Sequence, residues 1–267
     1  MSVGNSMDDR IDNRRIIEVA GLTAGYGDEV ILENVSLDVY VGEIVVIAGG
    51  SGSGKSTLLR HMIGLSTPFA GRIVIDGIDI TNGGEEGLAR VRRGLGVLFQ
   101  SGALLGSMTL EENIALPLSE FSDLSPSMIE MIVALKLAMV GLGGYEGYYP
   151  AELSGGMKKR AGIARAMALD PPVLFLDEPF AGLDPLTSAE LDLLIKRINR
   201  GMGTTMVIIS HELESIFDIA QRIIILDKST KGIIGTGDPR VLKEESPDPR
   251  VRNFLSRKID EDECTGG

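Results

Sequence analysis

The chain has 267 residues, a formal net charge of −12 and an apolar fraction of 43%. This length accommodates one large domain or two small ones with a substantial core. We expect no nucleic-acid partner, because non-specific binding of nucleic acids depends on basic side chains that neutralise phosphates. Since Cys264 is the only cysteine, a disulfide within one chain and a cysteine metal site are excluded, which fits a reducing compartment.

Hydropathy argues against a membrane-spanning segment, because no stretch approaches the ~18 consecutive apolar residues that such a helix needs. The best candidate, 131–140, is short and contains Lys136. Residues 1–15 carry three aspartates and no apolar core, so they do not read as a signal peptide, and we expect a flexible segment there. The sequence therefore predicts a soluble, cytoplasmic chain whose membrane role would come through a partner.

The first predicted strands form a hairpin. Residues 16–23 and 30–40 flank a turn at 25–28, and apolar and polar residues alternate in the second strand, as in a half-buried sheet. Tyr26 stands in the turn, upstream of a glycine-rich loop, where its ring could stack on an adenine base. The alternative is a turn tyrosine that packs on its own hairpin.

A phosphate-binding loop comes next. Residues 49–57 fit the pattern G-x-x-x-x-G-K-[ST] between an apolar run, 44–48, and a predicted helix. The glycines let backbone N–H groups approach phosphates, and the helix N-terminus adds a partial positive charge. Lys55 would reach the β- and γ-phosphates, and the Ser56 hydroxyl would ligate Mg²⁺. The residues predicted to hold the nucleotide are Gly49, Ser51, Gly52, Ser53, Gly54, Lys55, Ser56 and Thr57. The alternative is a glycine-rich turn, which the flanking strand and helix disfavour.

Residues 64–100 read as short elements: a break at 64–68, a hairpin around 76–77, a polar loop at 83–87, and a strand at 95–99 with Gln100 at its end. The stretch 101–160 is helical in character, with no evident strand. Thr109 and Glu112 form a predicted capping box, and a longer helix runs from Ser125-Pro126 to Gly141. An apolar stripe on that helix is predicted to be core, and it comprises Leu124, Met128, Met131, Ile132, Leu135 and Met139.

Strands then alternate with helices. The strands are predicted at 173–176, 206–209 and 223–226, and the helices at 157–169, 185–200 and 212–220. Such alternation implies a mostly parallel sheet covered on both faces. The predicted fold class is α/β, with an inserted α-helical subdomain at about 101–160. Helical pieces are predicted at 238–256, followed by an acidic tail at 257–267.

Two carboxylates end the strand at 173–176. Asp177 could hold the hydration shell of Mg²⁺, and Glu178 would point into the same crevice, where it could polarise a water for attack on the γ-phosphate. The alternative is a surface turn, which is less attractive beside a phosphate-binding loop.

A second anion site is predicted where Ser154, Gly155 and Gly156 start a helix. Ser154 is a plausible N-cap, and the paired glycines leave N–H groups free. A second phosphate site is redundant within one chain, but it makes sense if it serves the nucleotide of another copy. The alternative is an ordinary helix cap.

The chain resembles the ABC ATPase superfamily over residues 16–240, because a set of motifs occurs in the order that the superfamily has. The set comprises the phosphate loop and the segments 153–157, 174–179 and 181–184. The resemblance implies ATP and Mg²⁺ as ligands and a head-to-tail dimer with each ATP between the P-loop of one copy and the Ser-Gly-Gly signature of the other. It also implies roles for individual residues: Gln100 senses Mg²⁺ and water, His211 contacts the γ-phosphate, Asp184 lies at the dimer seam, Tyr26 stacks on adenine, and Ser154 and Gly156 meet the γ-phosphate across the dimer.

The signature departs from the superfamily at Met157, where most members have glutamine. A thioether cannot make the hydrogen bonds of an amide, so whatever contact the glutamine makes near the ribose is in doubt here. The following residues, Lys158-Lys159-Arg160, form either a solvated face or extra positive potential at the phosphates. His61 matches no motif and is expected to be a packing or surface residue.

A narrower resemblance, carried by 99–104, 113–118, Met157 and 247–255, is to the ATPases of MCE-type lipid transporters such as the Mla system. It implies phospholipid transport between inner and outer membranes, a multi-spanning permease, a periplasmic MCE subunit, and a position on the cytoplasmic side of the inner membrane. The alternatives are another cargo (amino acid, metal or drug), a soluble ABC ATPase of DNA repair or translation, and a scaffold with an inactive site. Residues 241–267 are predicted to be a C-terminal extension, and one hypothesis is that it clasps the second copy. For the fold, the superfamily resemblance implies a RecA-like P-loop NTPase core with an antiparallel β subdomain and the inserted helical subdomain.

Overall fold

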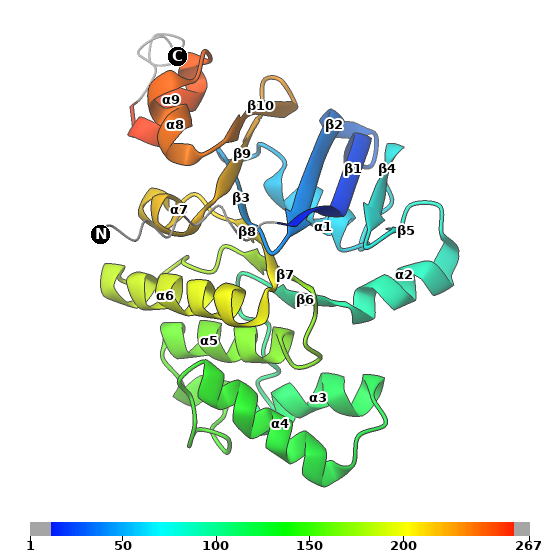
Figure 1. The fold of residues 1–267 in the computed structure, drawn as a ribbon, viewed down its shortest axis with the longest axis vertical. Helices are drawn as coiled ribbons and strands as arrows, with labels where there is room; N and C mark the ends of the chain where they lie inside the picture. The colour runs from blue at the N-terminus through cyan, green and yellow to red at the C-terminus, as the bar shows by residue number, and fades with distance from the viewer. Residues whose placement is uncertain (1–11, 259–267) are drawn as a thin grey trace, which may run out of the picture.

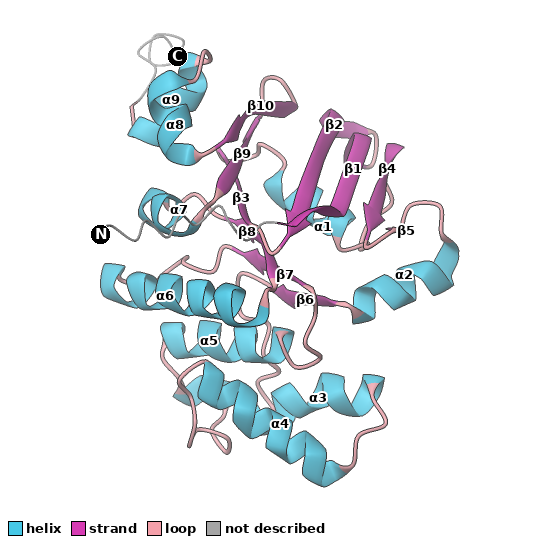
Figure 2. Ribbon diagram, viewed as in Figure 1, coloured by secondary structure: helices cyan, strands magenta, loops and turns pink. Residues whose placement is uncertain are grey.

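Two β-sheets organise the described residues, 12–258, in this computed structural model (Figures 1 and 2). The central sheet has the strand order β10-β9-β3-β8-β7-β6, and every neighbouring pair is parallel except β10 with β9. Its strands are β3 (Ile44–Gly49), β6 (Leu95–Leu98), β7 (Val173–Asp177), β8 (Thr205–Ile209), β9 (Arg222–Asp227) and β10 (Gly232–Gly237). The second sheet is antiparallel, in the order β2-β1-β4-β5, with β1 (Asp12–Tyr26), β2 (Glu29–Val41), β4 (Ala70–Ile75) and β5 (Ile78–Asp79).

The central strands are apolar throughout because both faces of the sheet are covered. In β3, Ile44 and Val46 pack in one core cluster, and Val45 and Ile47 pack in another. The first cluster holds α5 (Gly155–Ala166), α6 (Pro185–Met202) and α7 (Leu213–Ile219) against one face. The second holds α1 (Lys55–Met62) and the antiparallel sheet against the other. A parallel sheet buried on both faces is the arrangement that continuous apolar runs predict.

The inserted helical part consists of α3 (Leu110–Phe121) and α4 (Pro126–Met139), which lie far from the antiparallel sheet in Figure 1. The capping box at α3 is confirmed: the Thr109 hydroxyl accepts from the Glu112 N–H at 3.2 Å, and the Glu112 carboxylate accepts from the Thr109 N–H at 2.7 Å. Ser125 precedes α4 as expected, although its side chain makes no capping hydrogen bond. The α/β fold class, with an antiparallel and a helical subdomain, is thus confirmed.

The predicted core stripe of α4 is wrong for its three outermost members. Met128, Met131 and Leu135 are 49%, 73% and 56% exposed. The helix instead buries a neighbouring face, which comprises Val133, Lys136, Leu137 and the capping residue Val140. The stripe was misplaced because Lys136 counts as polar in a hydropathy pattern, whereas its stem lies in the core and its ammonium pairs with Asp170.

Three other elements differ from the prediction. The predicted polar loop at 83–87 is the start of α2 (Gly84–Arg93), in which Val91 is the one residue classed as buried. Strand β10 is rich in glycine and was not predicted, and β1 begins at Asp12, inside the segment expected to be flexible. The helical pieces near the C-terminus are α8 (Pro239–Glu245) and α9 (Pro249–Ser256), while Cys264 and the acidic tail from residue 259 on lie outside the described residues. Among residues 12–258, no helix is both long and apolar enough to cross a bilayer.

Candidate nucleotide site

Three loops meet at the carboxyl edge of the central sheet. Strand β8 lies between β3 and β7, and its residue Ile209 pairs with Ile47 on one side and with Asp177 on the other. The segments that follow these strands therefore emerge side by side, where they enclose a cavity of about 600 Å³. The cavity is lined by Gly49, Gly50, Ser51, Lys55, Glu178, His211, Leu213, Phe254 and Arg257. Residues far apart in the sequence thus share one site, at the edge where ligands bind in open α/β sheets.

The phosphate loop requires glycine at two positions. Gly49 has φ +146°, and a Cβ there would lie 2.2 Å from the Leu226 carbonyl oxygen. Gly54, at φ +97°, stands before α1, and a Cβ there would lie 2.5 Å from the Leu32 side chain. No side chain caps α1, and the buried Ser53 hydroxyl has no hydrogen-bond partner among residues 12–258. Unpaired donors at a helix N-terminus fit an anionic ligand such as a phosphate.

Lys55 lies across this loop. Its ammonium donates to the carbonyl oxygens of Gly49 at 2.9 Å and Gly50 at 2.8 Å. Burial lowers the pKa of Lys55, and the carboxylates of Glu178 and Asp177 act in the opposite direction. The carbonyl contacts hold the ammonium at the cavity wall, where it can exchange them for phosphate oxygens.

Glu178 and His211 form a pair that lines the same cavity. The Nδ1 atom of His211 lies 2.9 Å from Oε1 of Glu178. A carboxylate only accepts hydrogen bonds, so this Nδ1 carries the proton. Glu178 has φ +45°, which is unusual for a residue other than glycine, and its N–H donates to the Ile209 carbonyl at 2.9 Å. The carboxylate is therefore fixed in direction by its own backbone and by the histidine.

Hard oxygen donors for a cation stand next to this pair. Asp177 ends β7; burial raises the pKa of its carboxyl group, and the neighbouring charge of Glu178 raises it further. Ser56, in the first turn of α1, presents an exposed hydroxyl. Such donors fit Mg²⁺. Within residues 12–258, no cluster of three or more His, Cys, Asp or Glu side chains could hold a metal by itself, so Mg²⁺ would share its ligands with the phosphates.

Tyr26 ends β1, and its side chain contacts the first turn of α1 instead of being buried in its hairpin. The residue is 51% exposed, and its hydroxyl accepts from the Thr57 hydroxyl at 3.3 Å. The packing alternative for His61 holds: it is 2% exposed, and its Nδ1 lies 2.7 Å from the Thr57 carbonyl oxygen one turn earlier in α1.

The second predicted anion site lies away from the cavity. Ser154 caps α5, since its hydroxyl accepts from the Met157 N–H at 3.2 Å. Asp184 caps α6 by accepting from the N–H groups of Leu186 and Thr187, each at 3.1 Å, and the Thr187 hydroxyl lowers its pKa. The predicted dimer residues Ser154, Gly155, Gly156 and Asp184 are not among the residues that line the cavity.

Several residues at the site were missed or misjudged from the sequence. Lys159 is 6% exposed, so the solvated-face alternative does not hold there: its ammonium donates to the carbonyl oxygens of Gln100 at 2.5 Å and Glu178 at 2.9 Å. Gln100 itself follows β6 and is exposed. Phe254 and Arg257 reach the cavity from α9 and its C-cap, and no sequence pattern indicates that contact.

Comparison with known proteins agrees with this geometry. The family model of the ABC transporter matches residues 32–181. The probable ribonucleotide transport ATP-binding protein mkl of Mycobacterium leprae is 44% identical over 240 residues, which are 90% of this chain and 68% of that protein. The intermembrane phospholipid transport system ATP-binding protein MlaF of Haemophilus influenzae is 41% identical over 248 residues, 93% of each chain. A dimeric post-hydrolysis structure of the ATP-binding cassette MJ0796, bound to ADP and phosphate, superposes with a TM-score of 0.75 at 32% identity and covers 83% of this chain and 98% of that chain. The chain belongs to the ABC transporter family, as an ATPase that uses ATP with Mg²⁺.

Proposed function

We propose that the chain is the ATP-hydrolysing subunit of a transporter that moves phospholipid between inner and outer membranes, on the cytoplasmic side of the inner membrane. The MlaF relative, whose name states intermembrane phospholipid transport, supports this cargo because the alignment spans 93% of both chains. The mkl relative is named for ribonucleotide transport, so ribonucleotides are the second candidate cargo.

The observation that carries the enzymatic part is the cavity that brings Lys55 together with the paired Glu178 and His211. Lys55 and the N–H groups of the phosphate loop would bind the β- and γ-phosphates. Ser56 and Asp177, with Gln100 from the next loop, would hold Mg²⁺, which when bound neutralises charge between the phosphates.

Glu178 would take the proton of the attacking water. A carboxylate fixed by its backbone and by a histidine N–H can hold a water in line with the scissile bond, and positioning dominates catalysis of phosphoryl transfer. His211 would keep the carboxylate oriented through Nδ1, and in its doubly protonated form it would also donate from Nε2 to the γ-phosphate. Tyr26, beside α1, would stack on the adenine.

A second copy would complete each site. The N-terminus of α5, with Ser154 and the paired glycines, would be an anion site for another copy, because these residues do not line the cavity of their own chain. A head-to-tail dimer would place it on the γ-phosphate bound by the other copy, with Asp184 at the seam. The dimeric state named for MJ0796 supports this arrangement.

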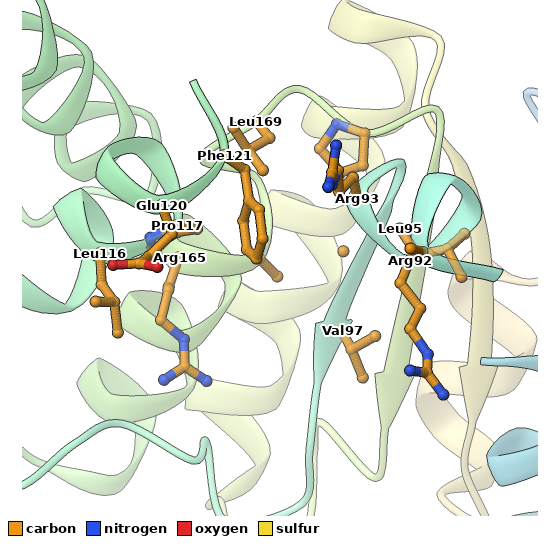
Figure 3. A pocket seen from close by; sticks show the side chains of 14 residues that line it. Arg92, Arg93, Leu95, Val97, Leu116, Pro117, Glu120, Phe121, Arg165 and Leu169 are labelled. Carbon is orange, nitrogen blue, oxygen red and sulfur yellow. The ribbon is translucent and has the colours of Figure 1, made fainter. Parts of the chain in front are cut away.

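A permease would dock in a separate hollow of about 640 Å³ between α2, β6, α3 and α5 (Figure 3). Figure 3 shows Phe121 on one side of it and Leu95 and Val97 of β6 on the other. Phe121 is 56% exposed, and the Arg93 guanidinium lies 5.8 Å from its ring centre. The lining is mainly apolar, and its charged residues are Arg92, Arg93, Arg165 and Glu120. Gln100 lies two residues after β6, so a docked segment would act on the loop that we propose reaches Mg²⁺. A periplasmic MCE subunit would complete the transporter.

The test of the enzymatic part is Glu178→Gln, which keeps the shape and removes the base. We expect ATP binding to persist and phosphate release to fall by about 10²-fold or more. Unchanged phosphate release would refute the assignment of Glu178. For cargo, the complex isolated from membranes would be reconstituted and assayed with a labelled phospholipid and a labelled ribonucleotide. ATP-dependent movement of the ribonucleotide alone would refute the phospholipid proposal.

A further inference from the structure

One face of helix α5 is hydrogen-bonded to the loop that follows β6. Lys159, Gly162 and Arg165 recur every three residues, so they share that face. Lys159 donates to the Gln100 carbonyl at 2.5 Å, and Arg165 donates to the Ala103 carbonyl at 2.6 Å. Between them, a Cβ on Gly162 would lie 2.5 Å from the Leu98 side chain and 3.1 Å from the Gly102 carbonyl oxygen. The helix and the loop at 100–103 are therefore in close contact and held by two cations.

The ammonium of Lys159 also contacts the backbone of Glu178, the proposed base. It donates to the Glu178 carbonyl oxygen at 2.9 Å, in addition to the Gln100 carbonyl. Burial lowers the pKa of Lys159, and the nearby carboxylates of Asp177 and Glu178 raise it. The side chain is buried at 6% exposure, so water does not replace these carbonyl contacts if they are lost.

The backbone at Glu178 needs such support. A positive φ of +45° is strained for a residue with a Cβ, and it persists only where neighbouring groups hold it. The Glu178 N–H is held by the Ile209 carbonyl, and its carbonyl accepts from Lys159 and, at 3.2 Å, from the Ala181 N–H. Without the Lys159 ammonium, the Glu178 carbonyl would keep only the longer hydrogen bond from the Ala181 N–H.

We propose that Lys159 is a positioning residue for hydrolysis, whose ammonium links the Gln100 loop to the peptide that aims the Glu178 carboxylate. The inference rests on the proposed roles of Glu178 and Gln100 and adds a physical connection between them. A displacement of the Gln100 loop is transmitted to the Glu178 backbone through this side chain, in addition to the pairing of β6 with β7. ATP binding, which uses the phosphate loop and Tyr26, does not depend on it.

The test replaces Lys159 by methionine, which keeps the stem and removes the donor. Lys136→Met is the matched control, because Lys136 is also buried, at 2% exposure, and pairs with Asp170 far from the site. Both variants are made in the full-length chain, isolated with its membrane partners. We expect Lys159→Met to lower kcat by about ten-fold or more while KM for ATP stays within about two-fold, and Lys136→Met to leave both unchanged.

Two further variants separate positioning from general damage. Lys159→Arg retains a cation that can donate to both carbonyls, so it should recover most of kcat, and it stands in if the methionine variant does not fold. Combining Lys159→Met with Glu178→Gln should lower kcat no further than Glu178→Gln alone, because both changes disable the same carboxylate.

The inference is overturned if Lys159→Met keeps kcat within about two-fold, if its loss of kcat matches that of Lys136→Met, or if the losses multiply in the double variant. Full activity of Glu178→Gln by itself would instead refute the proposed role of Glu178. The two failures are therefore distinguishable.

Discussion

Asp192, on α6, is a buried carboxyl group whose charge should lower stability at neutral pH. It is 5% exposed, and it accepts one hydrogen bond, from the Ser215 hydroxyl of α7 at 3.0 Å. Its other oxygen has no partner among the described residues. Burial, with a smaller contribution from Asp218, raises the pKa of Asp192, whereas Ser215 and Lys196 lower it, and the net result is a pKa of about 6. The folded protein therefore retains this proton at pH values where the unfolded chain has released it.

The sign and size of the effect follow from linkage. A raised folded-state pKa gives stability that is fully present below the unfolded pKa of 3.8 and is lost as pH rises through about 6. A shift of about two units corresponds to about 3 kcal/mol in total. About half of this loss, roughly 1.5 kcal/mol, falls between pH 5 and pH 8.

Asp192→Asn removes the titration but keeps the shape and the acceptor for Ser215. We expect the stability of the variant relative to the parent to increase by about 1.5 kcal/mol between pH 5 and pH 8, measured by urea denaturation at both values. Other titrating groups cancel in this difference. Glu190→Gln, at an exposed position of the same helix, is the control and should show little pH dependence. The reasoning fails if the Asp192→Asn difference is the same at both pH values.

Two other predictions concern buried polar groups. Glu43 is 2% exposed and accepts two hydrogen bonds from the Arg222 guanidinium, at 2.6 and 2.8 Å. Glu43→Gln removes the charge of this acceptor, while the Asp38 carbonyl still accepts from the guanidinium, so it should cost about 1.5–3 kcal/mol; a loss below about 0.5 kcal/mol in urea denaturation would contradict this. Asn113 is fully buried, and its side-chain amide donates to three carbonyls, those of Leu105, Met108 and Thr109. Asn113→Ala should therefore cost about 3 kcal/mol and speed hydrogen exchange at 105–109. Unchanged exchange there would show that the loop does not need this side chain.

Local chemistry explains which parts of the molecule the sequence could predict. The phosphate loop needs glycine at positions such as Gly49, where any side chain would strike the backbone of β9, so the pattern is visible in the sequence. The caps at Thr109, Ser154 and Asp184 depend on a side chain and the N–H groups two or three residues later, which are also local. The continuous apolar strands predicted a sheet covered on both faces for the same reason.

Contacts over long distances in the sequence were not predictable. Lys136 and Lys159 read as surface residues, yet tertiary packing buries each stem and supplies oxygen acceptors from distant segments. Strand β10 contains little apolar surface and exists because β9 offers it an edge. Arg257 reaches the nucleotide cavity only because α9 folds back over the sheet, where it also pairs with Glu212 at 3.5 Å. Each of these depends on the assembled fold rather than on a local pattern.

The central claim is that a hydrolysis site takes its base from one copy and its signature from another. Glu178→Gln removes the base, and Gly155→Asp places a negative charge at the N-terminus of α5, where a Cβ has room 3.7 Å from the Leu183 side chain. Each variant alone should be inactive. Mixed in equal amounts, they form hybrid dimers with one intact site, so phosphate release should reappear at about one quarter of the parental rate if pairing is random and each site acts independently. A mixture as inactive as its components would contradict the account.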